Sequence, residues 1–340
     1  MTQCSTISMT TLSLLSRFTI GVLAAGLLLL GAPSRAADGP IAVTLLGTGT
    51  PILNINRFGM STLVDAGDQK LLFDAGRGVA MRLHQVRVPA RALDAIFVTH
   101  MHSDHLTGLP DLYSIAPLPT EDGRRQVPLE IWGPPAIVGF ASALETMLAE
   151  NNRLRFAGRE LNIAATKINT QVLAEGAVYE RNGVKVTAFL VDHGYVQPAY
   201  GFRVDFAGRA VVLSGDTTYS PNLVKHAQGA DLLIHSVAIG SRKLEEAEPE
   251  YVGRFYKYLA NPETVGRVLN EVKPRQAVFS HISLYSREGV PRATEEELTA
   301  RVRAVYSGPV VIGQDLMSFV IGPGGVTANA YSPEVRSREP

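Results

Sequence analysis

The sequence predicts an α+β fold in which mixed sheets and helices pack in layers. Short apolar runs typical of buried strands alternate with segments of helical spacing along most of the chain. Two of these runs, 61–64 and 70–73, flank Gly67-Asp68 as the arms of a hairpin do, so a mixed sheet fits better than a purely parallel one. No long low-complexity linker interrupts the chain. We therefore expect one domain over residues 37–340.

The first 36 residues have the features of a signal peptide. Arg17 is the only charge before the apolar run 18–30, and small residues precede a cleavage site after Ala36. An uncleaved membrane anchor is the alternative, but the apolar run is shorter than the roughly 20 residues that span a bilayer. We expect a periplasmic or secreted protein that begins at Ala37 and has no stable membrane insertion after processing.

The composition limits the classes of partner that the protein could bind and the residue types that could ligate a metal. Lys+Arg and Asp+Glu are both 32, and the chain would lose Arg17 and Arg35 with the leader. Without a positive excess, no nucleic-acid partner is expected. The single cysteine, Cys4, also lies in the leader, so a metal site in the mature chain would use histidine and carboxylate ligands.

The first half of the domain shows five strand patterns and two clear helix starts. The strands are predicted at 41–46, 61–64, 70–73, 95–98 and 129–132. Helices are predicted from Gly78 to about Gln85 and over 135–150, and 106–110 begins a helix or a turn. The loop Gly47-Thr48-Gly49 lacks the third glycine and the following helix of a dinucleotide-binding motif.

The second half begins with a weakly patterned segment, 151–180, in which we expect a short helix or loop and edge strands. Further strands are predicted at 184–191, 201–206, 210–213, 232–234, 276–279, 310–312 and 319–320. Helices are predicted at 221–228, at 262–272 with Pro262 near its start, and at 294–306. The last opens on Thr294 and Glu297, which form a capping box.

The densest set of metal-ligand residues directly follows the strand 95–98. His100, His102, Asp104 and His105 lie within six positions. In an extended segment, side chains two residues apart point the same way, so the first three can face one side, and a turn at Asp104 can add His105. Imidazole and carboxylate groups together suit zinc, iron and related ions. The alternative is a solvated polar loop.

Three later loops each place a ligand-type residue directly after an apolar run. These residues are His193, Asp216 and His281, which follow the strands predicted at 184–191, 210–213 and 276–279. Strand ends at one edge of a sheet project their loops to the same place. We therefore expect these three residues to complete a site for two metals.

With these residues the chain resembles the metallo-β-lactamase-fold hydrolases. The motif His-x-His-x-Asp-His at 100–105, followed by His193, Asp216 and His281, is similar to that superfamily's dinuclear pattern. The stretches 45–51, 73–78, 199–203 and 279–283 resemble the branch with ribonuclease Z and the zinc arylsulfatases. The resemblance implies a four-layer αβ/βα sandwich of two mixed sheets with the metals at one edge.

The resemblance also implies how the ligands are shared. His100, His102 and His193 would hold the first metal, Asp104, His105 and His281 the second, and Asp216 would bridge them. Two divalent ions about 3.5–4 Å apart can share a hydroxide and stabilise charge on the attacking and leaving oxygens of an ester. We expect two divalent ions, with zinc favoured over manganese or iron.

Several other residues are candidates for supporting roles. Asp104 and His235 are the candidate catalytic residues. In ribonuclease Z the position that matches His235 is a histidine followed by glutamate, whereas Ser236 follows here, so His235 is either a general acid or a structural histidine. Asp74 is expected either to hydrogen-bond a ligand histidine or to cap the next helix. The side chains of Tyr195, Tyr200 and Arg203 are candidates for shaping the substrate pocket.

We expect an exported hydrolase of sulfate or phosphate esters, similar to the arylsulfatases, that acts on a small molecule. A ribonuclease Z-like phosphodiesterase or a lactonase is the alternative, and a homodimer is an open possibility. Against tRNA stand the neutral charge and the interval of only 23 positions from His193 to Asp216, too short for the long arm of bacterial ribonuclease Z. β-Lactamases lack an equivalent of Asp216. A non-catalytic metal-binding protein is the remaining hypothesis.

Overall fold

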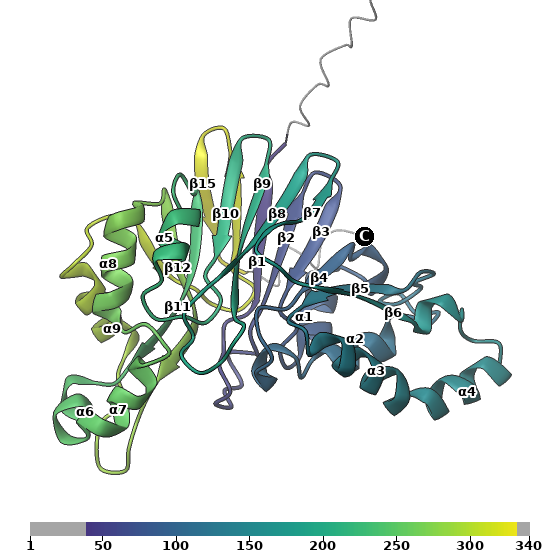
Figure 1. Cartoon of the computed structure of the whole chain (residues 1–340), viewed down its shortest axis with the longest axis horizontal. Coiled ribbons are helices and arrows are strands. Elements are labelled where there is room, and N and C mark those ends of the chain that lie inside the picture. Colours follow the sequence, from purple (N-terminus) through teal and green to yellow (C-terminus); the bar gives the residue numbers. More distant parts are fainter. Residues whose placement is uncertain (1–38, 332–340) are drawn as a thin grey trace, which may run out of the picture. The chain divides into compact units, whose positions relative to one another are not determined.

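A computed structural model describes residues 39–331, which form two mixed β-sheets with helices (Figure 1). The expected signal peptide and Cys4 lie outside the described residues. Between residues 39 and 331, no helix combines the length and the apolar character that a membrane span requires.

The first sheet has eight strands in the order β15-β14-β1-β2-β3-β4-β5-β6. Its strands are β1 (Ile41–Gly47), β2 (Ser61–Ala66), β3 (Gln69–Phe73), β4 (Ala95–Phe97), β5 (Leu129–Gly133), β6 (Ile168–Val172), β14 (Ser318–Gly322) and β15 (Gly325–Asn329). The pairs from β3 to β6 are parallel and the others are antiparallel. The hairpin predicted around Gly67-Asp68 is confirmed as β2 and β3.

The second sheet has seven strands in the order β13-β12-β11-β10-β9-β8-β7. Its strands are β7 (Gly176–Arg181), β8 (Val184–Leu190), β9 (Tyr200–Phe206), β10 (Arg209–Leu213), β11 (Leu232–Ile239), β12 (Gln276–Leu284) and β13 (Val310–Ile312). Strands β10 to β13 pair in parallel, and β7 to β10 pair in antiparallel fashion. Strands β6 and β7 are the outer strands of their sheets, which confirms the edge strands expected within 151–180.

Nine α-helices lie in the described part of the chain. They are α1 (Val79–Gln85), α2 (Leu109–Ile115), α3 (Ile137–Met147), α4 (Ala149–Ala157), α5 (Pro221–His226), α6 (Arg242–Ala247), α7 (Pro249–Tyr256), α8 (Pro262–Val272) and α9 (Glu295–Arg303). The predicted cap of α9 is confirmed, because the Thr294 side chain accepts a hydrogen bond from the Glu297 amide at 3.1 Å. In the same way, the Asn261 side chain caps α8.

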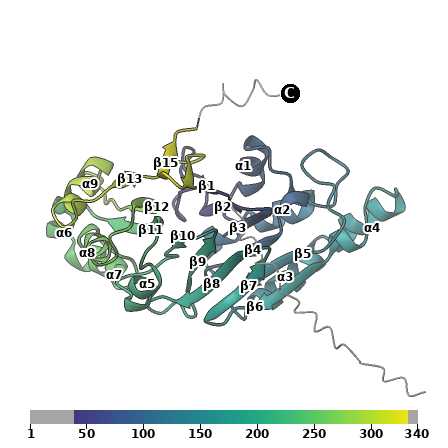
Figure 2. The ribbon, with the colours of Figure 1, turned by 90° about the horizontal axis from the view of Figure 1, so that it is seen from above.

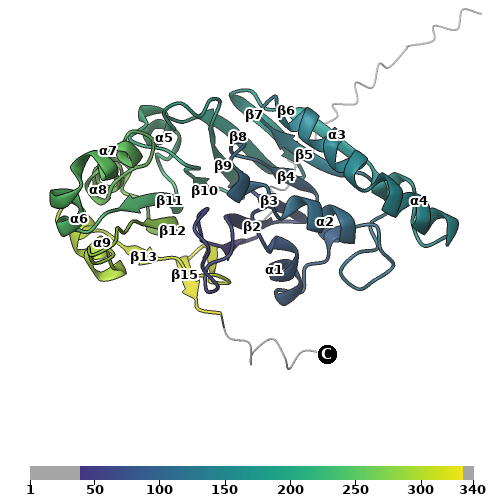
Figure 3. The ribbon, with the colours of Figure 1, turned by 90° about the horizontal axis from the view of Figure 1, so that it is seen from below.

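The helices cover the outer faces of the two sheets, as the two turned views show (Figures 2 and 3). One apolar cluster fills the space between the sheets and includes Val43, Phe97 and Phe202. A second packs the first sheet against α1, α2 and α3, and a third packs the second sheet against α5, α8 and α9. Alternating burial along β8 shows the cause, since every second side chain faces the core. These layers confirm the αβ/βα sandwich.

The prediction was wrong about where two strands end. β11 and β12 were expected to stop at residues 234 and 279, but they run to Ile239 and Leu284. The polar residues that suggested an end, including His235 and His281, are buried, and the two strands go on pairing with each other past them. Helices α6 and α7 were not predicted.

The loop that carries the metal-ligand motif packs tightly against the loop after β3. Gly76 lies at this contact, where a Cβ atom would stand 2.4 Å from the Asp104 carbonyl oxygen and 2.4 Å from the Gly59 carbonyl carbon. Both neighbours are backbone, so they cannot turn aside as a flexible side chain would. Glycine at residue 76 is therefore required for the two loops to meet.

We predict that Gly76→Ala lowers the free energy of unfolding by ~1–3 kcal/mol, because the added methyl group forces the two loops apart. Chemical denaturation of the metal-free protein measures this. Gly139→Ala is the matched control: Gly139 lies on α3, and a Cβ atom there would meet no neighbour within 4 Å, so the change should stabilise the helix. Equal effects of the two substitutions would contradict the tight contact at Gly76.

Candidate metal centre

The loops that follow β4, β8 and β10 bring most of the motif residues to one edge of the sandwich. His100 and His102 follow β4, and a short 3₁₀ turn, Ser103–His105, then carries Asp104 and His105. His193 follows β8 and Asp216 follows β10, as predicted from their strand patterns. The structure therefore brings together residues that lie up to 181 positions apart in the chain, from His100 to His281.

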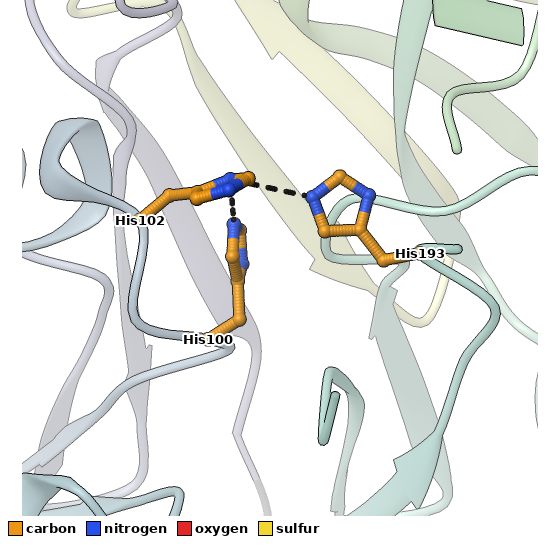
Figure 4. Close-up of side chains that lie close together, drawn as sticks. All are labelled: His100, His102 and His193. Atoms are coloured by element: carbon orange, nitrogen blue, oxygen red, sulfur yellow. Dashed lines mark hydrogen bonds between the residues drawn. The ribbon is translucent and has the colours of Figure 1, made fainter. Parts of the chain in front are cut away.

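His100, His102 and His193 form the first group, and their rings converge in Figure 4. The His102 Nδ1 atom lies 3.0 Å from His100 Nε2 and 3.4 Å from His193 Nε2. Ligand nitrogens around a tetrahedral zinc ion stand about 3.3 Å apart, given Zn–N bonds near 2.05 Å. The spacing of the three nitrogens matches one face of such a site.

Asp104, His105 and His281 form the second group, and all three are buried. The Asp104 Oδ2 atom lies 2.9 Å from His281 Nε2 and 3.6 Å from His105 Nε2. His105 Nε2 is buried without a hydrogen-bond partner among the described residues. A buried imidazole nitrogen in that state is costly unless it binds something, and a metal ion satisfies it.

Asp216 lies between the two groups. Its Oδ2 atom is 3.4 Å from His281 Nε2, 3.7 Å from His105 Nε2 and 3.9 Å from His193 Nε2. One carboxylate oxygen thus approaches histidines of both groups. This is the placement that a bridging ligand needs.

Hydrogen bonds to the second ring nitrogens turn two of the histidines toward the site. The Asp74 carboxylate lies 2.7 Å from His105 Nδ1, and it also accepts hydrogen bonds from the amide and hydroxyl of Thr99. The Tyr258 carbonyl oxygen lies 2.7 Å from His193 Nδ1. A proton on each Nδ1 leaves the Nε2 lone pair free for a metal. Asp74 thus makes the contact expected of it.

Burial keeps the first group of imidazoles uncharged. It lowers the pKa of His100 well below the usual value, with a further contribution from the His105 imidazole. Burial likewise lowers the pKa values of His102 and His193. Neutral imidazoles have free lone pairs near pH 7 and can bind a metal without first losing a proton.

Carboxylates dominate the electrostatics of the second group. Burial alone would lower the pKa of His105, but the carboxylates of Asp74 and Asp216 outweigh it and raise that pKa well above the usual value. Conversely, burial would raise the pKa of Asp216, but His281 and His105 outweigh it and hold this pKa well below the usual value. The buried carboxylates therefore demand positive charge, which a divalent cation can supply.

The backbone is bent into the left-handed region where two of these side chains are aimed. His281 has φ +47° and sits at an irregularity in the pairing of β12 with β11, so its side chain leaves the regular alternation of the strand. Asp74, directly after β3, has φ +58°. Such conformations cost of order 1–3 kcal/mol outside glycine and persist only where the surrounding structure holds them.

The structure does not bring His235 into the ligand groups. His235 lies within β11, and its alternation places it with Leu233 and Val237, which face the helices. Its Nδ1 atom lies 2.6 Å from the Ser236 carbonyl oxygen, and burial lowers the pKa of the ring to about 4. A ring that is neutral near pH 7 is poorly suited to donate a proton, so the geometry favours the structural alternative.

The three residues expected to shape the substrate pocket differ in exposure and in bonding. Tyr200 is buried and donates its hydroxyl to the Leu173 carbonyl oxygen, and Arg203 forms an ion pair with Asp205. Tyr195, by contrast, is 78% exposed beside His193. Tyr258 was missed because it contacts His193 through its backbone carbonyl, which any residue type could provide. No side-chain pattern could have signalled it.

The donor set fits a metal centre. It consists of imidazole and carboxylate groups, which suit zinc, iron or manganese. The orphaned His105 Nε2 and the nitrogen spacing of the first group are what metal binding would satisfy. His100, His102, His193 and their partners are thus buried His/Asp clusters of the kind that bind metal ions.

Sequence comparisons give matches over most of the chain. A model described as a β-lactamase superfamily domain matches residues 69–282. Ribonuclease Z of Mycobacterium sp. strain KMS is 35% identical over 289 residues, covering 84% of this chain and 97% of that protein. Ribonuclease Z of Mycobacterium bovis strain BCG Pasteur is 32% identical over 283 residues, covering 83% of this chain and 99% of that protein.

Solved structures show the same fold. The metallo-β-lactamase fold protein YhfI from Bacillus subtilis superposes with a TM-score of 0.65 at 20% identity, over 83% of this chain and 100% of that one. The short form of human tRNase Z gives a TM-score of 0.58 at 21% identity, over 82% of this chain and 98% of that one.

We predict that Asp74→Asn weakens metal binding at the second group by about 10- to 100-fold, because the amide no longer fixes His105 with Nε2 toward the site. Asparagine tolerates the left-handed backbone at residue 74, so the fold should persist. Metal titration of the apoprotein measures the two affinities. Unchanged affinity at both groups would show that the Asp74–His105 contact does not matter for binding.

His235 should make the folded protein sensitive to acid. Its pKa is about 4 in the folded state against 6.5 for a free histidine, so only the unfolded chain takes up its proton between those values. The free energy of unfolding should fall by ~3 kcal/mol as the pH drops through this window.

In His235→Gln this contribution should disappear, and hydrolysis at pH 7 should continue. Urea denaturation of the metal-free protein at pH 7 and pH 4, with the wild type as control, measures the first effect. A variant with the same pH dependence of stability would refute the predicted contribution of His235. A variant that is folded and metal-loaded but inactive would restore the general-acid hypothesis.

Proposed function

Because the chain belongs to the β-lactamase superfamily and is related to ribonuclease Z, we propose that this metal-dependent ester hydrolase is a dinuclear phosphodiesterase. The observation that carries the proposal is the position of Asp216, whose single oxygen lies within 3.9 Å of histidines from both ligand groups. A carboxylate so placed suits two metals held side by side.

Each group of side chains has a part in the proposed site. His100, His102 and His193 would hold one ion, Asp104, His105 and His281 the other, and Asp216 would contact both. Two divalent ions supply Lewis acidity that acidifies water and neutralises charge on a phosphoryl group. The partly exposed His102 marks the side from which the ester would enter, because the other ligands are buried.

Similarity favours phosphate over sulfate as the ester. The relatives at 32–35% identity are named ribonuclease Z, which supports the phosphodiesterase alternative better than the arylsulfatase-like expectation. RNA itself is less well supported, because the chain carries no excess positive charge and the interval from His193 to Asp216 is short. We therefore propose a small phosphodiester as the substrate and zinc as the metal.

The proposal also covers export of the protein and the extent of its catalytic domain. We propose that residues 1–36 direct export to the periplasm or beyond and that 37–340 is the catalytic domain. Residues 1–36 lie outside the described part, so the support is the apolar run and the small residues before Ala37. Mass analysis of the mature N-terminus tests this processing.

A substrate panel tests the proposed reaction. Zinc-loaded protein should hydrolyse bis(p-nitrophenyl) phosphate in preference to p-nitrophenyl sulfate, a lactone, a β-lactam and a precursor tRNA. A preference for p-nitrophenyl sulfate would instead support the arylsulfatase hypothesis. Turnover of the β-lactam alone, or of the precursor tRNA alone, would contradict a small phosphodiester.

Asp216→Ala should lower diester hydrolysis by roughly 100-fold or more and remove one of two bound metals, because both ions lose a shared ligand. Elemental analysis and the diester assay measure the two effects together. Asp205→Ala is the matched control, since that carboxylate pairs with Arg203 on β9 and lies outside the ligand groups. Full activity with two metals in Asp216→Ala would refute the assignment.

A further inference from the structure

A series of aromatic rings from α7 and from three neighbouring segments begins at the metal-ligand residue His193. The ring of Tyr258 lies edge-on to His193, 5.5 Å between centroids, and Tyr195 lies edge-on to Tyr258, also at 5.5 Å. Phe255 continues the series at 6.1 Å from Tyr258 and stacks on Tyr285 at 4.0 Å. We refer to Tyr195, Tyr258, Phe255 and Tyr285 as the aromatic ladder.

The ladder is fixed relative to the ligands. The Tyr258 backbone carbonyl holds His193 Nδ1, so this residue contacts the metal centre directly. Gly194 has φ +61°, and a Cβ atom there would stand 2.9 Å from the Tyr258 Cβ atom. Glycine thus lets the loop after β8 press against Tyr258, and the same loop carries Tyr195. The two tyrosines therefore keep a set position beside His193.

The outer end of the ladder is open. Tyr195, at one end of the ladder, is 78% exposed, and Tyr258 is partly exposed. Tyr285, at the other end, is buried. Aromatic rings that are anchored on one side and exposed on the other can stack on a flat ligand at little entropic cost, because few rotatable bonds need to be ordered. The exposed pair is the part of the ladder that a ligand can reach.

Positively charged residues lie on the segment that leads into Tyr258, where the Lys257 carbonyl oxygen would stand 3.3 Å from a Cβ atom at Gly194. Arg254 and Lys257 are exposed on and directly after α7, and Arg287 is exposed in the lining of the same recess. The guanidinium groups of Arg254 and Arg287 lie over the Tyr251 ring, 5.6 Å and 4.1 Å from its centroid. This open recess of about 540 Å³ contains all three cations, together with the carboxylates of Glu248 and Glu250. Three cations against two carboxylates leave this recess with a positive balance, which favours an anionic ligand.

We propose that Tyr195 and Tyr258 form a subsite for a flat aromatic ring attached to the phosphoryl group of the substrate. Lys257 and Arg254 would attract the anionic ester toward it. This inference rests on the proposed phosphodiesterase function and adds the substrate class: phosphate esters with a ring, either a nucleobase or an aryl group. Tyr195 is accordingly a specificity-determining residue that contacts the ring.

Binding of ring-bearing and ringless phosphates tests the subsite without requiring turnover. Calorimetric titration of zinc-loaded protein would use phenyl phosphate, thymidine 5′-monophosphate and methyl phosphate, which share the phosphoryl group. The wild type should bind at least one ring-bearing ester about tenfold more tightly than methyl phosphate. The ester that gains shows whether the ring is an aryl group or a nucleobase.

Tyr195→Ala should abolish this preference, and affinity for methyl phosphate should stay at the wild-type level. Tyr195→Phe keeps the ring and should retain the preference, which separates stacking from the hydroxyl group. The KM for bis(p-nitrophenyl) phosphate should also rise about tenfold in Tyr195→Ala.

Two failures can be told apart. If wild-type protein preferred no ring, or if Tyr195→Ala kept the preference, the subsite would be refuted even where the diester is hydrolysed. If wild-type protein hydrolysed no phosphodiester, the proposed function would fail, whatever the titrations showed.

Discussion

Two carboxylates, Asp104 and Asp216, are buried at one edge of the sandwich, and the free-energy cost of burying them must be offset by the groups around them. Both are nearly inaccessible to solvent, and a buried unpaired carboxylate is strongly destabilising. Imidazoles surround them within 2.9–3.9 Å. The negative charge of the two carboxylates is neutralised only if protons or metal ions supply positive charge. The side chains that would hold a metal therefore also make the stability of this edge of the fold depend on metal binding.

Bringing those groups together requires unusual backbone at the strand ends. Gly76 and Gly194 allow loops to approach closer than any Cβ atom would permit, and Asp74 and His281 accept left-handed conformations. The apolar core between the sheets is what holds these positions, since it fixes the directions of β3, β8, β10 and β12. Strain at the site is therefore stabilised by burial elsewhere in the fold.

Sequence could predict those parts of the site that depend on neighbouring residues, but not those that depend on the pairing of distant strands. The ligands at 100–105 and at residues 193 and 216 follow short apolar strands, so the sequence pattern alone places them at one edge. His281 lies in a candidate ligand group, but for another reason than the predicted one: it lies within β12 at an irregular register, not at a strand end. His235 lies within β11 in the same way, but with regular alternation, so it faces the helices. Sequence periodicity cannot separate these two cases, because the difference lies in the pairing of two distant strands.

Chemistry and specificity are coupled through one short segment. Tyr258 orients His193 through its carbonyl oxygen and contributes its ring to the aromatic ladder. The segment after α7 therefore positions a candidate metal ligand and, on our proposal, the substrate's ring together. The ligand side chains define a reaction class that many esters could share. The segment after α7 determines which groups can lie beside them. A change of backbone there would alter metal affinity and ring binding at once, whereas a change confined to the Tyr195 side chain would alter ring binding alone.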